Sequence, residues 1–445
     1  MIRIRLAVVA ATTILLVAPA TIATAHQPVP SRTSIPPAAE AQILSRDLRI
    51  RAEFGLSLHQ SSIQAASNGY GTSTDLLGIP LTPAERADIA HRDLLIPMID
   101  RLNQRLINNN VFAGLWIDQH KGGVLHFAQT SGDLSPVVES YITPDHPVVY
   151  ETFANSLSQL NSTEAAVTAA VLSHHGEARY INSSSVSVPD NAVVLVLKND
   201  APAGTDQALN RTYGAKRISI RRGVSEARPA SNRDIRTGPL YGGEYIYNKN
   251  SNGSCTAGFS DATSGGNYFT ITAGHCGNGV WYRGYQNTQY GIGSAHSNHF
   301  IVNGSSKCDC VAVGPISSSI RTASVLVVNN GTNHYVGTAS SYPTGARVCL
   351  SGATSAGKGS DINCGEIKSS GGTIGEGDGY TLVDPVATSI QGFPGDSGGP
   401  VGNNATQLIG LYASTSYYMP SGAFYQSYLS KGVNIGPTVG VSLVY

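Results

Sequence analysis

The positions of the cysteines constrain this chain more than any other feature. All six lie in the C-terminal half, and residues 26–254 contain none. They are Cys255, Cys276, Cys308, Cys310, Cys349 and Cys364. In an exported protein such residues are candidate disulfide partners. A chain of 445 residues is also too long for one ordinary domain. We therefore expect two differently built parts.

The first residues are typical of a secretory signal peptide. Arg3 and Arg5 form a basic start, and an apolar run follows from Leu6 to about Ile22. Ala23-Thr24-Ala25 then gives an A-x-A cleavage pattern before His26. The run is too short for a transmembrane anchor, and no other apolar stretch is long enough to span a bilayer. The sequence predicts a signal peptide over residues 1–25 and a secreted, extracellular protein without a membrane partner.

The part before the cysteines has an α+β pattern. Thr82-Pro83-Ala84-Glu85 is a capping box that predicts a helix to about Asn108. A second helix is expected from Ser162 or Thr163 to His174. Expected strands are Val111–Asp118, Gly123–Gln129 and Asn191–Lys198.

From about Ser225 to Gly238 the chain is polar and rich in arginine, which is typical of an exposed, protease-sensitive linker. Beyond it, short β-branched or aromatic runs alternate with turn signals, and we expect an all-β barrel or sandwich. Only Ala423–Leu429 is expected as a helix. The runs are Tyr268–Ala273, Val280–Tyr282, Val311–Val313, Ser324–Val328, Ala346–Cys349 and Gln407–Tyr412.

Charge and the weaker motifs exclude several function classes. Lys+Arg and Asp+Glu both number 29, so there is no global electrostatic case for nucleic acid or an acidic membrane. His174-His175 lacks metal-ligand spacing. The glycine-rich segment Gly375–Gly379 has no strand-to-helix context and is expected to be a turn. We expect neither a cofactor nor a metal.

Gly395-Asp396-Ser397-Gly398-Gly399-Pro400 presents a serine among glycines. A serine is a weak nucleophile until a base removes its proton. The glycines allow backbone angles at which the N–H groups of Gly395 and Ser397 can converge on a developing oxyanion. Ser397 is therefore the candidate nucleophile.

Thr272-Ala273-Gly274-His275-Cys276 presents a histidine after an apolar strand, and His275 is the candidate general base. In the order His–Asp–Ser a carboxylate between His275 and Ser397 should orient the ring. Asp309 is preferred because it opens the apolar run Asp309–Val313, which would bury it. The other carboxylates are Asp361, Glu366, Glu376, Asp378, Asp384 and Asp396; we place Asp361, Glu376 and Asp378 in loops.

Together the segments Thr272–Cys276, Asp309–Val313 and Gly395–Pro400 resemble the catalytic blocks of the chymotrypsin-like serine proteases, most closely the bacterial streptogrisin and α-lytic protease branch. The likeness covers residues 239–445 well and extends weakly to Phe112–Asp118. It implies an all-β protease domain (239–445) of two six-stranded antiparallel β-barrels with the site between them. It also implies an α+β pro-region (26–238) that assists folding and inhibits until removed. The enzyme would be a monomeric serine endopeptidase that acts on proteins or peptides through an acyl-enzyme.

The resemblance further implies the disulfides Cys255–Cys276 and Cys349–Cys364. Cys308 and Cys310 flank Asp309, and either a strained disulfide or two free thiols is compatible with their spacing. The chain also departs from the branch. Gln391 and Leu350 replace a usual cysteine and a usual arginine, so Asp396 is expected to pair with Arg347 or with a new N-terminus near Leu240.

Specificity depends on a pocket whose floor is expected near Ser389, where no acidic residue lies. This disfavours Lys or Arg at P1, the residue whose carbonyl is attacked, and favours apolar or small side chains. The expected substrate-binding strand contains Ala413, Ser414 and Thr415 and lacks the usual glycines, so Thr415 can narrow the pocket. Small and aromatic P1 residues are both open. The altered strand also keeps an alternative open, a catalytically silent protease-like secreted binding protein.

Overall fold

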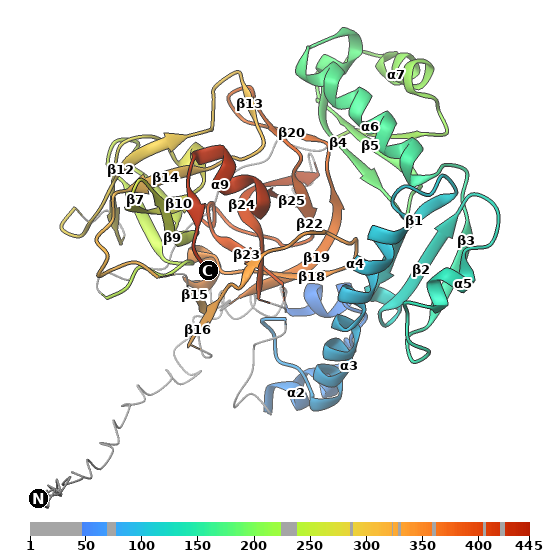
Figure 1. Cartoon of the computed structure of the whole chain (residues 1–445), viewed down its shortest axis with the longest axis horizontal. Coiled ribbons are helices and arrows are strands. Elements are labelled where there is room, and N and C mark those ends of the chain that lie inside the picture. The colour runs from blue at the N-terminus through green and yellow to red at the C-terminus, as the bar shows by residue number, and fades with distance from the viewer. Residues whose placement is uncertain are drawn as a thin grey trace, which may run out of the picture.

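The computed structural model describes residues 47–68, 77–223, 238–284, 288–322, 324–327, 331–357, 362–403, 406–418 and 423–445. The predicted signal peptide, Asp361 and nearly all of the predicted linker lie outside these ranges. Elements before residue 224 (the N-terminal part) and those after residue 237 (the C-terminal part) lie side by side (Figure 1).

The N-terminal part is α+β, as predicted. A helix over residues 47–53 precedes the other elements. The helices are α2 (Gln60–Asn68), α3 (Pro83–Asp93), α4 (Leu95–Leu106), α5 (Ser135–Glu139), α6 (Leu157–Leu172) and α7 (Thr205–Tyr213). The strands are β1 (Phe112–Asp118), β2 (Val124–Gln129), β3 (Val148–Thr152), β4 (Ile181–Ser187), β5 (Ala192–Leu197) and β6 (Ile218–Arg221).

Two helix boundaries differ from the sequence expectation. The capping box of Thr82 and Glu85 is present, but the helix is interrupted at Leu94 and resumes as α4. Pro97 explains this, because it has no N–H to donate to residue 93 and its ring would clash with that carbonyl. Helix α6 begins earlier than expected: its N-cap is Ser156, which forms a capping box with Gln159. The Ser-Thr-Glu signature lies inside this helix.

The C-terminal part is built almost entirely of strands, and each run predicted as a strand forms one. Its helical elements are η4 (Gly274–Cys276), α8 (Ala353–Gly357) and α9 (Gly432–Val439). One group of strands is β7 (Tyr245–Asn248), β8 (Gly253–Thr256), β9 (Phe259–Ser264), β10 (Asn267–Thr272), β11 (Val280–Arg283), β12 (Gly291–Asn298), β14 (Val311–Gly314) and β26 (Ser442–Leu443). A second is β17 (Gly337–Thr338), β18 (Arg347–Leu350), β19 (Asn363–Ser370), β22 (Val386–Thr388), β23 (Pro400–Gly402), β24 (Gln407–Tyr418) and β25 (Ala423–Lys431).

These strands form one closed barrel and one further sheet. The order β24-β23-β18-β19-β22-β25 returns to β24 through a β24–β25 pairing, which closes a six-stranded ring. The other sheet has the order β26-β9-β10-β14-β12-β11-β7-β8. Its pairings among the described residues do not close a ring, so the second predicted barrel is not confirmed.

The prediction of a helix over Ala423–Leu429 was wrong. This segment belongs to strand β25, and the helix α9 follows it. The strand pairs with both β22 and β24 and thereby closes the barrel. Its aromatic residues have high strand propensity, and the two ladders outweigh any local helical preference.

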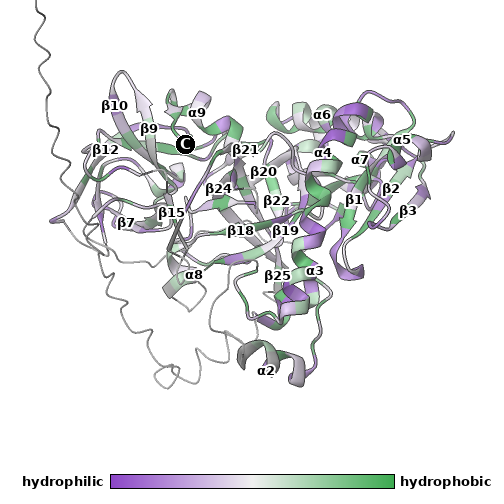
Figure 2. Ribbon diagram, turned by 60° about the horizontal axis from the view of Figure 1, so that its bottom comes forward, coloured by the Kyte–Doolittle hydropathy of each residue, from purple (hydrophilic) through white to green (hydrophobic). Residues whose placement is uncertain are grey.

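The two parts share a sheet and a core. Strand β20 (Thr373–Glu376) pairs with β4 of the N-terminal part, within a sheet that also contains β13 (Ser305–Ser306) and β21 (Tyr380–Val383). One hydrophobic core runs from α4, β1 and β2 into the closed barrel. Figure 2 shows hydrophobic residues along strands and helices of both parts, interspersed with hydrophilic ones. A small separate sheet pairs β15 (Ser324–Val327) with β16 (Gly331–His334).

Within the described residues, no helix combines the length and the apolar character needed to cross a membrane.

Candidate active site

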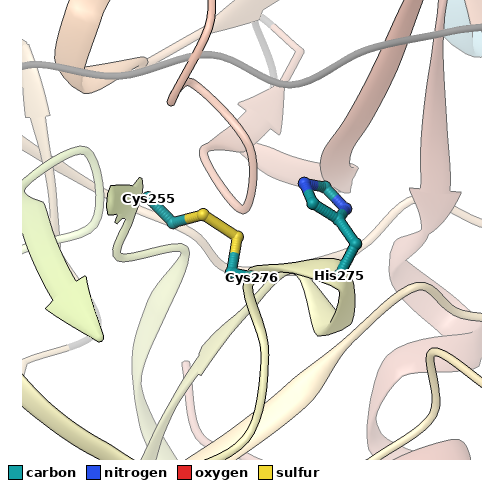
Figure 3. A group of neighbouring side chains, drawn as sticks. All are labelled: Cys255, His275 and Cys276. Carbon is teal, nitrogen blue, oxygen red and sulfur yellow. A yellow bond between two sulfur atoms is a disulfide. The ribbon is translucent and has the colours of Figure 1, made fainter. Parts of the chain in front are cut away.

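His275 lies on a short helical turn that begins where β10 ends. The turn η4 includes Gly274, His275 and Cys276, and a disulfide joins Cys276 to Cys255 at the end of β8. Figure 3 shows the imidazole ring and the disulfide rising from the same turn. Gly274 has no side chain to accommodate, and a Cβ there would lie 2.6 Å from an Asn298 oxygen. The disulfide and this close packing fix the backbone that carries the ring.

Asp309 meets His275 because their strands are neighbours. In the β10–β14 ladder Thr272 is opposite Val311, so the residues just beyond these ends converge. The Asp309 carboxylate accepts hydrogen bonds from His275 at Nδ1 (2.5 Å) and at the backbone N–H (2.8 Å). Asp309 is fully buried, and its own N–H donates to Ser430 Oγ at 2.9 Å. The carboxylate therefore holds both the ring and the turn.

The other ring nitrogen of His275, Nε2, is buried and has no hydrogen-bond partner among the described residues. Burial of the ring disfavours its protonation, but the facing Asp309 carboxylate, with a smaller contribution from Glu376, raises the pKa of His275 above its ordinary value. A histidine oriented through Nδ1, with Nε2 available, is arranged to accept a proton.

The Ser397 loop is fastened to the strand that leads to the disulfide. Thr256 donates its hydroxyl to the Gly395 carbonyl at 2.6 Å and its N–H to the Ser397 carbonyl at 2.8 Å. Gly395 and Gly398 have φ angles of 93° and 83°, which favour glycine. A Cβ at Gly398 would lie 2.7 Å from the Ala273 backbone nitrogen. The serine loop thus packs directly against the residues that precede His275.

Asp396 is bound differently from either expectation. Its carboxylate accepts hydrogen bonds from the N–H groups of Phe393, Thr354 and Ser355 and from the Ser355 hydroxyl, at 2.6 to 3.0 Å. These bonds come from neither Arg347 nor Leu240, and the pairing expected with a new N-terminus applies only to the cut protein. Arg347 instead forms a buried ion pair with Asp93 of α3, at 2.7 Å. Burial raises the pKa of Asp396, whereas the bonds from Ser355, Phe393 and Thr354 act against the shift. The turn α8 thus replaces the expected charged partner.

Glu376 is a site residue that the sequence reasoning assigned to a loop. It is the last residue of β20, and carboxylate or imidazole atoms of Glu376, Asp309 and His275 lie within 4.8 Å of one another. Ser414 Oγ donates to its Oε1 at 2.5 Å, and its Oε2 is buried without a partner among the described residues. Burial, together with the Asp309 charge, raises the pKa of Glu376 to about 8. A second carboxyl group therefore adjoins the His275–Asp309 pair.

The predicted pocket residues Ser389, Ala413, Ser414 and Thr415 are all buried. Ser397 Oγ lies 3.5 Å from the Ala413 carbonyl, which places β24 beside the serine. Ser389 is contacted by the N-terminal part: its hydroxyl bonds to Glu53, and its carbonyl accepts from Arg49 at 3.2 Å. Both contacts join residues more than three hundred positions apart, so the sequence alone could not predict them.

The six cysteines form three pairs. Cys349 and Cys364 join the neighbouring strands β18 and β19, and Cys308 and Cys310 join each other across Asp309. The second of these is one of the two states left open by the sequence. His91, Asp145 and His146 form a further group whose ligand atoms lie close together, but His146 already bonds through both nitrogens. We assign no metal role to it.

No family model matches the chain. The chain is 27% identical over 171 residues to serine protease 2 of Streptomyces fradiae, which covers 38% of this chain and 91% of that protein. Among solved structures, protease A of Thermobifida fusca is 28% identical, covering 46% of this chain and 98% of its own, with a TM-score of 0.37. A Nocardiopsis protease is 25% identical, covering 46% and 100%, with a TM-score of 0.38.

The curated relative is matched over nearly its whole length, at the level expected of a distant homologue. The predicted resemblance is thereby confirmed: this chain is similar to bacterial chymotrypsin-like serine proteases.

Proposed function

We propose that the chain is a secreted serine endopeptidase made as a zymogen, with His275, Asp309 and Ser397 as its catalytic triad and with a preference for apolar or small P1 residues. The observation that carries the proposal is the His275–Asp309 pair. Asp309 fixes Nδ1, Nε2 has no partner among the described residues, and the Ser397 loop packs against Ala273, two residues before His275.

In this mechanism Ser397 Oγ attacks the peptide carbonyl while its proton passes to His275 Nε2. Asp309 stabilises the imidazolium that forms. The N–H groups of Gly395 and Ser397 would bind the oxyanion, an interaction whose loss typically costs on the order of 10²–10³ in rate. His275 then gives its proton to the departing amine, which leaves an ester on Ser397. Water then attacks this ester and gives a proton to His275. His275 passes the proton to Ser397 Oγ as the acid product leaves.

The zymogen proposal is supported by how closely the N-terminal part is joined to the rest. A shared sheet through β4 and β20, a buried Asp93–Arg347 ion pair and the Glu53–Ser389 contact link them. We propose residues 26–238 as the pro-region and 239–445 as the protease domain. Ser389 lies at the expected pocket floor, so the contact with Glu53 would oppose substrate binding until the N-terminal part is removed.

The test is covalent labelling of the secreted protein with a fluorophosphonate, which reacts with activated serines. We expect one adduct, on Ser397, in the protein from which residues before about 239 have been cut. The Ser397→Ala variant, processed by added protease where it cannot process itself, is the control and should give none. A folded, processed protein that is not labelled would favour the catalytically silent binding protein, the alternative suggested by the altered residues Ser414 and Thr415.

A further inference from the structure

Tyr412 occupies a position that is fixed by the nucleophile loop. Its backbone N–H donates to the Gly399 carbonyl at 2.8 Å, and its carbonyl accepts from Gly398 N–H at 2.7 Å. The next residue, Ala413, is the one whose carbonyl lies 3.5 Å from Ser397 Oγ. The backbone of Tyr412 is thus bonded to the two residues that follow the nucleophile.

The Tyr412 side chain bridges three segments of the closed barrel. Its hydroxyl accepts from Gly392 N–H at 3.2 Å and bonds to Ser427 Oγ at 2.8 Å and to Thr415 Oγ1. Gly392 fits only because it has no side chain, since a Cβ there would lie 2.4 Å from the ring. The phenol therefore closes the space between the segment before the nucleophile and strands β24 and β25.

The sequence placed strand β24 and Ser389, which precedes Gly392, at the specificity pocket, and the structure adds β25 to them. The ring of Tyr412 and the hydroxyl of Ser427 are fully buried, and Ser427 Oγ also donates to the Ile390 carbonyl at 2.6 Å. The hydroxyl of Tyr412 thus has three partners among the described residues, Gly392, Thr415 and Ser427. A long substrate side chain would have to displace the ring and leave buried polar groups unpaired, which protein interiors tolerate poorly.

We propose that Tyr412 is the specificity-determining residue of this protease and that its ring restricts P1 to glycine or alanine. This inference rests on the proposed function, because it needs Ser397 to be the nucleophile. It narrows the open choice between small and aromatic P1 residues, and it moves the restriction from Thr415, the residue that the sequence suggested, to the residue three positions before it.

The test compares peptide p-nitroanilides of one sequence that differ only in P1, with alanine, leucine or phenylalanine. The enzyme is the processed product of the full chain. We expect the native enzyme to cleave the alanine substrate at least about 100-fold better than the phenylalanine substrate in kcat/KM. Tyr412→Ala should reduce that ratio by about tenfold or more, whereas Tyr412→Phe, which keeps the ring, should change it by no more than about threefold.

Tyr245→Ala is the matched control, because it removes another fully buried tyrosine, in the other sheet of the C-terminal part. It should lower stability without changing the P1 ratio. A native enzyme that cleaves the phenylalanine substrate as well as the alanine one would overturn the inference, even if Tyr412→Ala failed to fold. So would a fluorophosphonate-labelled Tyr412→Ala variant with the native ratio. A native protein that neither cleaves nor is labelled would instead refute the proposed function, and the inference with it.

Discussion

The two sides of this site are held together in different ways. On one side, His275 and Asp309 come from adjacent strands, and a single carboxylate holds the ring and its turn. On the other side, the hydroxyls of Tyr412 on β24 and Ser427 on β25 bond to each other and to backbone groups of the segment before Ser397. The first arrangement depends on a few strong contacts and the second on many weak ones. Chemistry should therefore be lost through one substitution, whereas specificity should change in graded steps.

The largest effect is expected at Asp309. Asp309→Asn keeps the shape but cannot hold the same ring tautomer, and kcat should fall by about 10⁴. The measurement is peptide hydrolysis, with fluorophosphonate labelling slowed in parallel. Asp384→Asn, which alters a carboxylate that bonds to Lys431 and Asn434, is the control. If Asp309→Asn lowered kcat by less than about tenfold, another group would orient the His275 ring, and Glu376 would be the leading candidate.

The contrast explains what the sequence could and could not predict. Ser397, His275 and Asp309 lie in short segments whose residue types carry the chemistry locally, so the motif order was enough to propose them as the triad. Glu376 was considered, but it was assigned to a loop, because its approach to His275 requires the pairing of β20 with β4 and β21. The donors that bind the Asp396 carboxylate, from Phe393, Thr354 and Ser355, are here called the cradle. The sequence analysis missed the cradle because neutral hydroxyl and backbone donors leave no charge pattern in a sequence.

A smaller loss is expected when this cradle is weakened. Ser355→Ala removes the 2.6 Å hydrogen bond to the buried Asp396 carboxylate, which precedes Ser397. A hydrogen bond to a charged group contributes about 1.5–3 kcal/mol, so the free energy of unfolding should fall by about this amount. The same loosening should lower kcat by about tenfold through the oxyanion donors. Urea unfolding and hydrolysis rates measure the two effects.

The exposed Ser318 offers the matched control, since Ser318→Ala removes a hydroxyl from the surface. It should alter neither quantity. If Ser355→Ala kept native stability and rate, the cradle would not support the Ser397 loop.

A pH-dependent effect is expected at Glu376. Its pKa of about 8 exceeds the ordinary 4.5, so the folded state holds this proton more tightly than the unfolded state. The stabilisation from the proton is complete below about pH 4.5 and is lost as the pH rises through about 8. Glu376→Gln is neutral at every pH. The melting temperature of the native protein should therefore fall relative to that of Glu376→Gln between pH 5 and pH 9, by about 3 °C or more.

Ionisation of Glu376 should affect activity and stability in opposite directions, because it lowers the stability of the fold but favours catalysis. At pH 7 Glu376 is mostly protonated, so Glu376→Gln should keep kcat/KM within about threefold. Above pH 8 the ionised carboxylate stabilises the His275 imidazolium, and the native enzyme should exceed the variant by several-fold. If the native enzyme and Glu376→Gln had the same pH dependence of kcat/KM and the same pH dependence of melting temperature, both expectations would be contradicted.

The smallest effect is expected at Thr415. Thr415→Val keeps the size of the side chain and removes the hydroxyl that bonds to Tyr412 and Ser427. If specificity depends on the ring, the preference for alanine over phenylalanine at P1 should change by less than about threefold, because the Gly392 and Ser427 bonds still hold the phenol. The p-nitroanilide series measures this directly. A change as large as that of Tyr412→Ala would show that Thr415 itself narrows the pocket, and that one contact governs specificity just as one carboxylate governs the chemistry.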